Sequence, residues 1–243
     1  MAPPRVLLNV AAHTLRASVP MVLDGLLGRI ERGAVDRRID AWSRGLLDAL
    51  GVRVRVRGAE HLRGWRPAVV MSNHQSHYDI PVLFQVIPAP LRMVAKAELQ
   101  RIPVWGEAMR VAGIVFIDRG DRARAIANLQ RAKEQLARGV SVWIAPEGTR
   151  SPDGALGAFK KGGFVLAREV GAAIVPVTVS GTRDVLPPRS LATRAGVEVT
   201  VTIHPRVDPR AFATRDALME AMRAAIASAL PAQGAAENGR PPG

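Results

Sequence analysis

Valine and arginine alternate from Val52 to Arg57, and this period of two predicts a strand with one solvent-exposed face. Short hydrophobic runs predict six further strands, at residues 68–72, 92–95, 114–117, 140–145, 173–179 and 197–204. Helical periodicity appears at residues 122–138, 161–170 and 214–230. Because strands and helices alternate along the chain, we predict an α/β sandwich with a mainly parallel or mixed central sheet.

Two amphipathic helical segments precede this domain, within residues 1–50. On the first segment the polar residues form one narrow stripe: Arg5, Asn9, His13 and Arg16. The rest of its surface is apolar and wider than one packing contact requires, and Pro20 predicts that the helix breaks there. The second segment, within residues 35–50, has an apolar stripe of ordinary width, so we expect it to pack on the domain core.

The first segment has the character of a helix that lies in the headgroup region of a membrane. Arg5, Arg16 and Arg29 would add attraction to an anionic membrane surface. Its apolar stretches are shorter than the roughly 18 to 20 residues that cross a bilayer, and no signal-peptide cleavage site is evident. We expect a peripheral or monotopic protein at the cytoplasmic face of the inner cell membrane. Residues 51–230 form the predicted main domain, and residues 231–243 are expected to be a disordered tail.

The charge balance favours an acidic partner, since 34 Lys+Arg stand against 21 Asp+Glu, a formal net charge of +13. A basic nucleic-acid-binding protein without catalysis is one interpretation. However, aromatic residues make up only 4% of the chain and no known nucleic-acid motif appears, so we expect no nucleic acid as a partner. The chain has no cysteine, which excludes disulfides, thiolate metal sites and a cysteine nucleophile.

The first candidate chemistry follows a predicted buried strand, in the segment Asn73–Pro81. His74 and Asp79 are five residues apart, so they would lie about 140° apart on a continuous helix but can meet across a loop. We predict that Asp79 is the N-cap of the following helix. An imidazole held by a carboxylate is an oriented general base. A capping aspartate beside a surface histidine has the same spacing, so the pair alone leaves both interpretations open.

Two further clusters also follow predicted strands. Gly113–Arg119 is a strand that ends in a charged turn, and by itself it also fits a solvated Asp-Arg pair. Ala145–Ser151 is a turn containing Pro and Gly, in which Arg150 can hold phosphate oxygens bidentately. Lys96 follows another strand and could supply a second cation to the same edge of the sheet.

Four blocks of the chain, in this order and at these intervals, resemble the motifs of the glycerolipid acyltransferases. They are Asn73-His74-x-Ser76-x-x-Asp79, Gly113-x-x-Phe116-Ile117-x-Arg119, Pro146-Glu147-Gly148-Thr149-Arg150-Ser151 and Val175-Pro176-Val177. The likeness covers roughly residues 50–205, is greatest to the bacterial 1-acylglycerol-3-phosphate acyltransferases, and implies a glycerol-3-phosphate acyltransferase-like αβ sandwich. The third block departs from the family pattern, because Ala145 stands where an aromatic residue is usual.

The resemblance implies an acyltransferase in which His74 takes the proton from an acceptor hydroxyl and Asp79 orients the imidazole. The hydroxyl then attacks an acyl thioester, without a covalent acyl-enzyme. The residues implied to bind the glycerol phosphate of the acceptor are Lys96, Arg119, Glu147, Gly148, Thr149 and Arg150. Neither a cofactor nor a metal is implied, and acyl-CoA or acyl carrier protein is the co-substrate.

The implied acceptor is a lysophospholipid, 1-acylglycerol 3-phosphate, and the product is phosphatidic acid for phospholipid biosynthesis. Another lyso-lipid or glycerol 3-phosphate remains open as the acceptor. A non-catalytic lipid-binding relative would keep the fold and lack the base, and the intact His74 and Asp79 argue against it.

Overall fold

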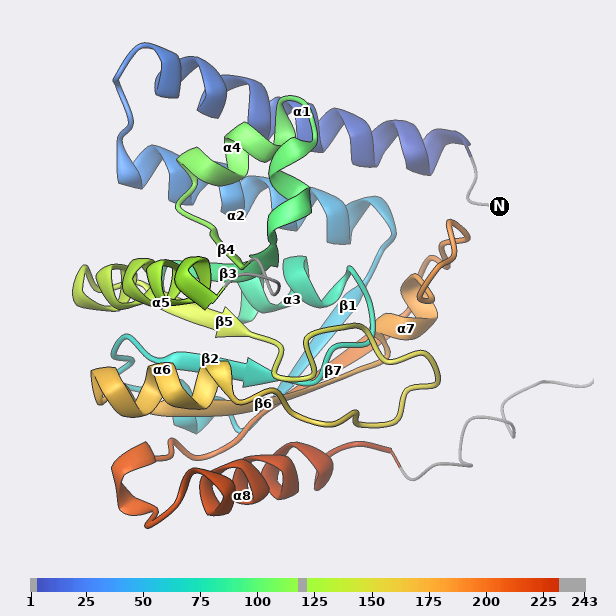
Figure 1. The fold of residues 1–243 in the computed structure, drawn as a ribbon. Helices are drawn as coiled ribbons and strands as arrows, with labels where there is room; N and C mark the ends of the chain where they lie inside the picture. Colours follow the sequence, from blue (N-terminus) through green and yellow to red (C-terminus); the bar gives the residue numbers. More distant parts are fainter. Residues whose placement is uncertain (1–3, 118–121, 232–243) are drawn as a thin grey trace, which may run out of the picture.

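The computed structural model describes residues 4–117 and 122–231 (Figure 1). Arg119 and the predicted tail from residue 232 onward lie outside the described residues. The elements follow in this order: α1 (Pro4–Leu26), α2 (Arg32–Ala49), β1 (Arg53–Arg57), η1 (Ala59–Leu62), β2 (Val69–Ser72), α3 (Asp79–Val86), β3 (Leu91–Lys96), η2 (Ala97–Arg101), α4 (Trp105–Val111), β4 (Val115–Ile117), α5 (Arg122–Ala137), β5 (Ser141–Ile144), α6 (Gly162–Val170), β6 (Ile174–Ser180), α7 (Thr182–Val185), β7 (Glu198–Ile203), η3 (Pro209–Ala211) and α8 (Arg215–Ala227).

The seven strands found in the described residues form one sheet, in the order β1-β7-β6-β2-β5-β3-β4. β6 and β7 pair antiparallel, and the other neighbouring pairs are parallel. Each predicted strand is present, with its ends shifted by no more than one residue, and the mixed sheet is confirmed. Because β6, β2, β5 and β3 run parallel, their C-terminal ends lie at one edge, where open α/β sheets bind ligands.

Alternate residues of the strands supply two hydrophobic cores, one on each face of the sheet. On β2, Val70 belongs to the core that includes residues of α1, α2, α3 and α4. Val69 and Met71 point the other way, into the core formed with α5, α6 and α8. The sheet therefore lies between two helical layers, with α1 and α2 on one outer side and α8 on the other (Figure 1).

α1 is one continuous helix through Pro20, so the predicted break is wrong. A proline inside a helix removes one backbone hydrogen bond and crowds the preceding turn. Packing of α1 against both α2 and α4 offsets this cost. Ser18 and Met21, which lie close to Pro20 in the helix, are both buried. Of the predicted polar stripe, Arg16 is exposed, whereas His13 lies directly against Gly45 of α2.

α2 packs on the domain core, where Val35 and Leu46 are buried. An ion pair also joins it to the sheet: Nη2 of Arg92, on β3, lies 2.6 Å from Oδ1 of Asp36. Arg92 is only 4% exposed, so this pair is nearly desolvated on its cationic side. The expected packing of this helix on the domain is confirmed, because α1 and α2 share one hydrophobic core with residues after position 50.

None of the helices that the structure describes combines the length and the hydropathy needed to cross a membrane.

Candidate active site

The candidate site lies where β2 and β5 end, at Ser72 and Ile144. The loops that follow these strands are tied together, because the N–H of Ser151 donates to the carbonyl oxygen of His74 at 2.7 Å. Asn73 makes two hydrogen bonds of 2.8 Å with the backbone of Val179, one through Nδ2 and one through Oδ1. Asn73 thus continues the pairing of β2 with β6 beyond the strand and fixes the point from which the loop carrying His74 begins.

His74 and Asp79, predicted to act as a pair, do meet. Nδ1 of His74 lies 2.7 Å from Oδ2 of Asp79, whose side chain is fully buried, while the His74 side chain is 17% exposed. A carboxylate oxygen can only accept here, so Nδ1 carries a proton, and in the neutral form of the ring Nε2 holds the lone pair. Within the described part of the chain Nε2 has no hydrogen-bond partner, which leaves it able to take a proton from a bound molecule.

Asp79 is the first residue of α3 and not its N-cap, which is Tyr78, so the predicted cap is wrong. The carboxylate turns back to the preceding loop, where Oδ2 also accepts the N–H groups of Gln75 at 2.8 Å and Ser76 at 3.0 Å. These two hydrogen bonds stabilise the buried negative charge of Asp79, because one contact with an imidazole would not replace the water that the carboxylate has lost. They also close the loop so that His74 can reach its partner.

Two residues outside the predicted site contact the pair. Oγ1 of Thr182 donates to Oδ1 of Asp79 at 2.5 Å. The indole of Trp143 meets the His74 ring edge-on, with 5.7 Å between the ring centroids and an interplanar angle of 88°. Both residues lie close to a motif block along the chain, and that proximity is the one signal by which the sequence could have indicated them.

Glu147, predicted to bind the acceptor, is buried and bonded to the main chain. Oε1 accepts the N–H of His74 at 2.9 Å, and Oε2 accepts the N–H of Gly157 at 2.7 Å. Burial raises the pKa of Glu147, while these two N–H groups act in the opposite direction. Since both oxygens are taken up by the backbone, the geometry favours a positioning role for Glu147 over direct contact with the acceptor.

The other residues predicted to bind phosphate lie at the same edge of the sheet. Gly148 has a φ of 72°, a left-handed conformation that glycine adopts without strain, so it permits the turn after β5. Thr149 is exposed and Arg150 is half-buried on this turn. β3 extends three residues beyond its last pair with β5 and ends in the exposed Lys96, which brings Lys96 to the same side. Arg119 lies outside the described residues.

His77 shows that Arg150 and the catalytic pair belong to one electrostatic environment. Desolvation by the protein atoms around its ring, and after it electrostatic repulsion from Arg150 and from the His74 ring when that ring is protonated, lower the pKa of His77 to about 4. Part of the side chain nevertheless remains exposed. His77 is therefore neutral at physiological pH, and Arg150 lies close enough to influence the titration of its ring.

The described residues include no group of three or more His, Asp or Glu side chains placed to hold a metal ion. What they do present is an imidazole oriented by a buried carboxylate at the ligand-binding edge of a mixed sheet, with Arg150 close enough to His77 to lower the pKa of that ring. Such a site is suited to activating a hydroxyl group on an anionic substrate.

The fold and this pair define an acyltransferase-type α/β protein. Residues 53–180, more than half of the 243-residue chain, match the family model described as acyltransferase, and the protein belongs to this family.

Relatives with curated names agree with this assignment. The chain is 37% identical over 166 residues to a 1-acyl-sn-glycerol-3-phosphate acyltransferase of Chlamydomonas reinhardtii, covering 68% of this chain and 49% of the relative. It is 41% identical over 135 residues to 1-acyl-sn-glycerol-3-phosphate acyltransferase alpha of Homo sapiens, covering 55% of this chain and 48% of the relative. The chain thus spans about half the length of these curated relatives.

A solved structure resembles almost the whole chain. The crystal structure of the 1-acyl-sn-glycerophosphate acyltransferase PlsC from Thermotoga maritima superposes with a TM-score of 0.73 at 28% sequence identity. The match covers 93% of this chain and 96% of that one, so it includes the N-terminal helices as well as the sheet. The predicted acyltransferase fold is confirmed.

Proposed function

We propose that this protein is a lysophospholipid acyltransferase, which moves a fatty acyl group from acyl-CoA or acyl carrier protein to the free hydroxyl of 1-acylglycerol 3-phosphate. The observation that carries the proposal is the contact of 2.7 Å between His74 and Asp79, with Nε2 open at the sheet edge. The names of the relatives, all of them acyltransferases for this acceptor, support the choice of substrate.

The reaction follows from the tautomer of His74. Nε2 removes the proton of the acceptor hydroxyl while the hydroxyl oxygen attacks the carbonyl carbon of the thioester. Asp79 stabilises the imidazolium that forms, as the carboxylate of a catalytic triad does. When the tetrahedral intermediate collapses, the C–S bond breaks and the imidazolium returns its proton to the leaving thiolate. The products are the ester and a free thiol, and His74 is neutral again.

The phosphate of the acceptor is held by cations at the same edge. The guanidinium of Arg150 can form two parallel hydrogen bonds with phosphate oxygens, and Lys96 adds a second positive charge. Arg119 is included in this proposal on its motif position alone. Glu147 takes part by holding the backbone of His74 rather than by touching the phosphate.

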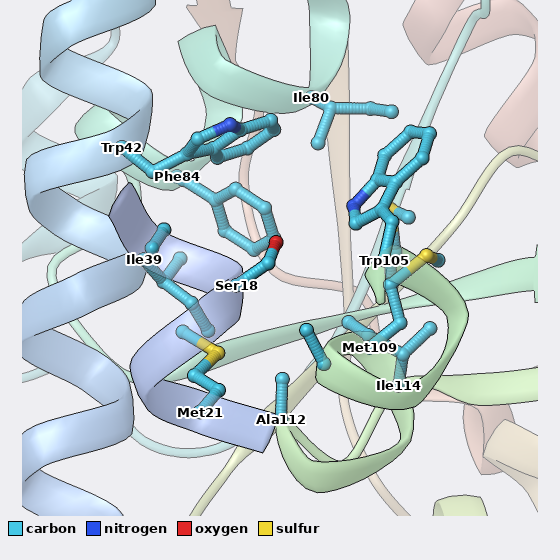
Figure 2. Close-up of a pocket in the computed structure, with 13 residues that line it drawn as sticks. Ser18, Met21, Ile39, Trp42, Ile80, Phe84, Trp105, Met109, Ala112 and Ile114 are labelled. Carbon is cyan, nitrogen blue, oxygen red and sulfur yellow. The ribbon is translucent and has the colours of Figure 1, made fainter. Parts of the chain in front are cut away.

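An apolar cavity suits a fatty acyl chain. It lies between α1 and α2 on one side and α3 and α4 on the other, and all its lining residues except Ser18 are hydrophobic. Trp42 and Phe84 face Trp105 across it (Figure 2). Ile80, which also lines the cavity, directly follows Asp79 on α3, so one helix carries residues of both the cavity and the catalytic pair. A pocket of this kind gains its affinity by removing methylene groups from water.

The exposed face of α1 supports attachment to a membrane surface. Five large apolar residues on it are at least 42% exposed: Leu8, Leu15, Val19, Leu23 and Leu26. Arg16 is exposed on the same helix, where it can meet anionic headgroups. We place this face in the headgroup region of the cytoplasmic leaflet, where acyl-CoA and acyl carrier protein are available.

The test is an acyl-transfer assay with the full chain in detergent micelles. Acyl-CoA or acyl carrier protein is offered with 1-acylglycerol 3-phosphate, other lysolipids and glycerol 3-phosphate, and thiol release and ester product are both measured. We expect transfer to 1-acylglycerol 3-phosphate, and a loss of about 100-fold or more in His74→Ala. His61→Ala, in η1, is the matched control and should keep full activity. Absence of transfer to every lysolipid, or equal transfer by His74→Ala, would refute the proposal.

A further inference from the structure

The buried carboxylate of Asp79 is held differently at its two oxygens. Oδ2 receives three N–H groups, from the His74 ring and from the backbone of Gln75 and Ser76. Oδ1 receives one partner within the described part of the chain, the hydroxyl of Thr182 at 2.5 Å. One oxygen of the carboxylate is therefore held by its own loop, and the other is held by one side chain that lies 103 residues away in the sequence.

The backbone around Thr182 is built to bring its hydroxyl to this place. Thr182 is fully buried at the start of α7, directly after Gly181. Gly181 has a φ of 96°, and a Cβ at this position would lie 2.6 Å from the carbonyl oxygen of Glu198. Only glycine therefore permits the chain to leave β6 at this angle. The segment after β2, which carries Asp79, and the segment after β6, which carries Thr182, are also joined by the two hydrogen bonds between Asn73 and Val179. Val179 lies on β6, three residues before Thr182.

We propose that Thr182 is a positioning residue for the acyl transfer: its hydroxyl holds Oδ1 of Asp79 and so fixes the plane of the carboxylate in which Oδ2 meets Nδ1 of His74 and Nε2 is directed to the acceptor hydroxyl. This inference rests on the proposed function. A carboxylate has a broad, two-fold torsional preference, so its own rotamer does not fix the plane of the group. The hydroxyl of Thr182 is donated to Asp79, so Thr182 acts through the pair and does not touch the substrate.

Removing this hydroxyl has a predictable electrostatic sign. The N–H groups of Gln75 and Ser76 still hold Oδ2 beside the ring, so a carboxylate that lacks the hydroxyl donor is less well stabilised as an anion and stabilises the neighbouring imidazolium more strongly. His74 then stays protonated to higher pH, and the acid limb of the pH–rate profile moves upward. A residue that only filled space would change the stability of the protein and leave this limb where it was.

The experiment compares Thr182→Val, which keeps the shape and removes the hydroxyl, with Thr182→Ser, which keeps the hydroxyl. For Thr182→Val we expect kcat to fall about 10- to 100-fold, with both KM values within about twofold and the acid limb moved upward. Thr182→Ser should recover most of kcat and return the limb to the wild-type position.

Thr178→Val is the matched control. Thr178 lies on β6, is 1% exposed, and donates its hydroxyl to the carbonyl oxygen of Ile226 at 2.7 Å, away from the pair. The control loses a buried hydrogen bond of the same kind, so its melting temperature should fall while kcat and the acid limb stay as in the wild type. If Thr182→Val does not fold, Thr182→Ala takes its place in the series.

The pH titration of the His74 ring, followed by NMR, separates this inference from the proposed function. In Thr182→Val its titration midpoint should move to higher pH, and in Thr178→Val it should not. This readout decides the inference even if the wild-type protein transfers no acyl group to any lysolipid, which would refute only the function. An unchanged His74 midpoint in Thr182→Val, or equal loss of kcat in Thr182→Ser and Thr182→Val, would overturn the role of Thr182.

Discussion

The N–H of His74 donates to Oε1 of Glu147 at 2.9 Å, so the residue proposed as the base is held at its backbone by the motif block after β5. The second oxygen of Glu147 accepts the N–H of Gly157 at 2.7 Å. One carboxylate therefore links the loop after β2 to the long loop between β5 and α6. This link explains why a buried acid lies among residues that the motif pattern associates with phosphate.

Glu147→Gln should lower kcat, because an amide has only one oxygen and must turn its NH₂ group toward one of the two N–H donors. Leaving a buried donor unsatisfied costs about 1–3 kcal/mol, so we expect kcat about 10- to 100-fold lower, with KM little changed. The assay is release of the free thiol from acyl-CoA. Glu134→Gln, an exposed position on α5, serves as the control. A large rise in the KM for the acceptor at unchanged kcat would instead support the predicted phosphate-site role.

Replacing His77 should make the folding stability of the protein less sensitive to acid pH. Because the pKa of His77 is lowered to about 4 in the folded protein, from an ordinary 6.5, the unfolded chain binds the proton more readily between these values. His77 therefore contributes stability that is present above pH 6.5 and is lost as the pH falls toward 4. In His77→Gln the melting temperature should fall less over this range. NMR titration of His77 with a midpoint near 6.5 would contradict the prediction.

Asp36→Ala should destabilise the fold by about 3 kcal/mol, because it leaves the Arg92 guanidinium, which is 4% exposed, without its counter-ion. We take the low end of the range for broken buried pairs, since the Asp36 side chain is 26% exposed. Chemical denaturation measures the change. Glu198→Gln breaks an exposed pair with Arg55 and should cost at most about 1 kcal/mol. Equal effects of the two variants would mean that the pair with Arg92 does not anchor α2.

Local pattern predicted the elements of this fold well. The valine and arginine alternation gave β1, and each other strand coincided with a hydrophobic run, because burial of alternate side chains is a local property. The order of the strands depends on contacts between distant segments, and the pattern does not encode it directly. Pro20 shows the same limit, since the packing of α1 on α2 and α4 outweighs a local signal for a break.

The residues of the candidate site likewise fall into those that local sequence predicts and those that depend on tertiary contacts. The pairing of His74 with Asp79 was predicted because both belong to one block, and the loop between them is short. Thr182 and Trp143 were missed because their contacts with the pair depend on how β6 and β5 lie beside β2. Glu147 was found by its motif, but its bonds to two backbone N–H groups are tertiary contacts, so its role could not be predicted from the sequence.

The double variant Leu15→Gln/Leu23→Gln should weaken binding to membrane vesicles, because the two leucines are 53% and 52% exposed on the outer face of α1 and make no large contribution to the core. Full burial of a leucine is worth roughly 1.5–3 kcal/mol, and about half of that for these half-exposed side chains predicts a loss of binding of about tenfold or more. Flotation on vesicles containing anionic lipid measures the effect.

Val56→Thr makes a matched control, since Val56 is an exposed apolar residue that lies on the edge strand β1 and not on α1. Its flotation should equal that of the wild type, and all three proteins should acylate a short-chain lysolipid dissolved below its micelle concentration at the same rate. The variants would then separate membrane attachment from catalysis, because the leucines act only where the acceptor lies in a bilayer. Unchanged flotation of the double variant would instead show that this face of α1 does not meet the membrane.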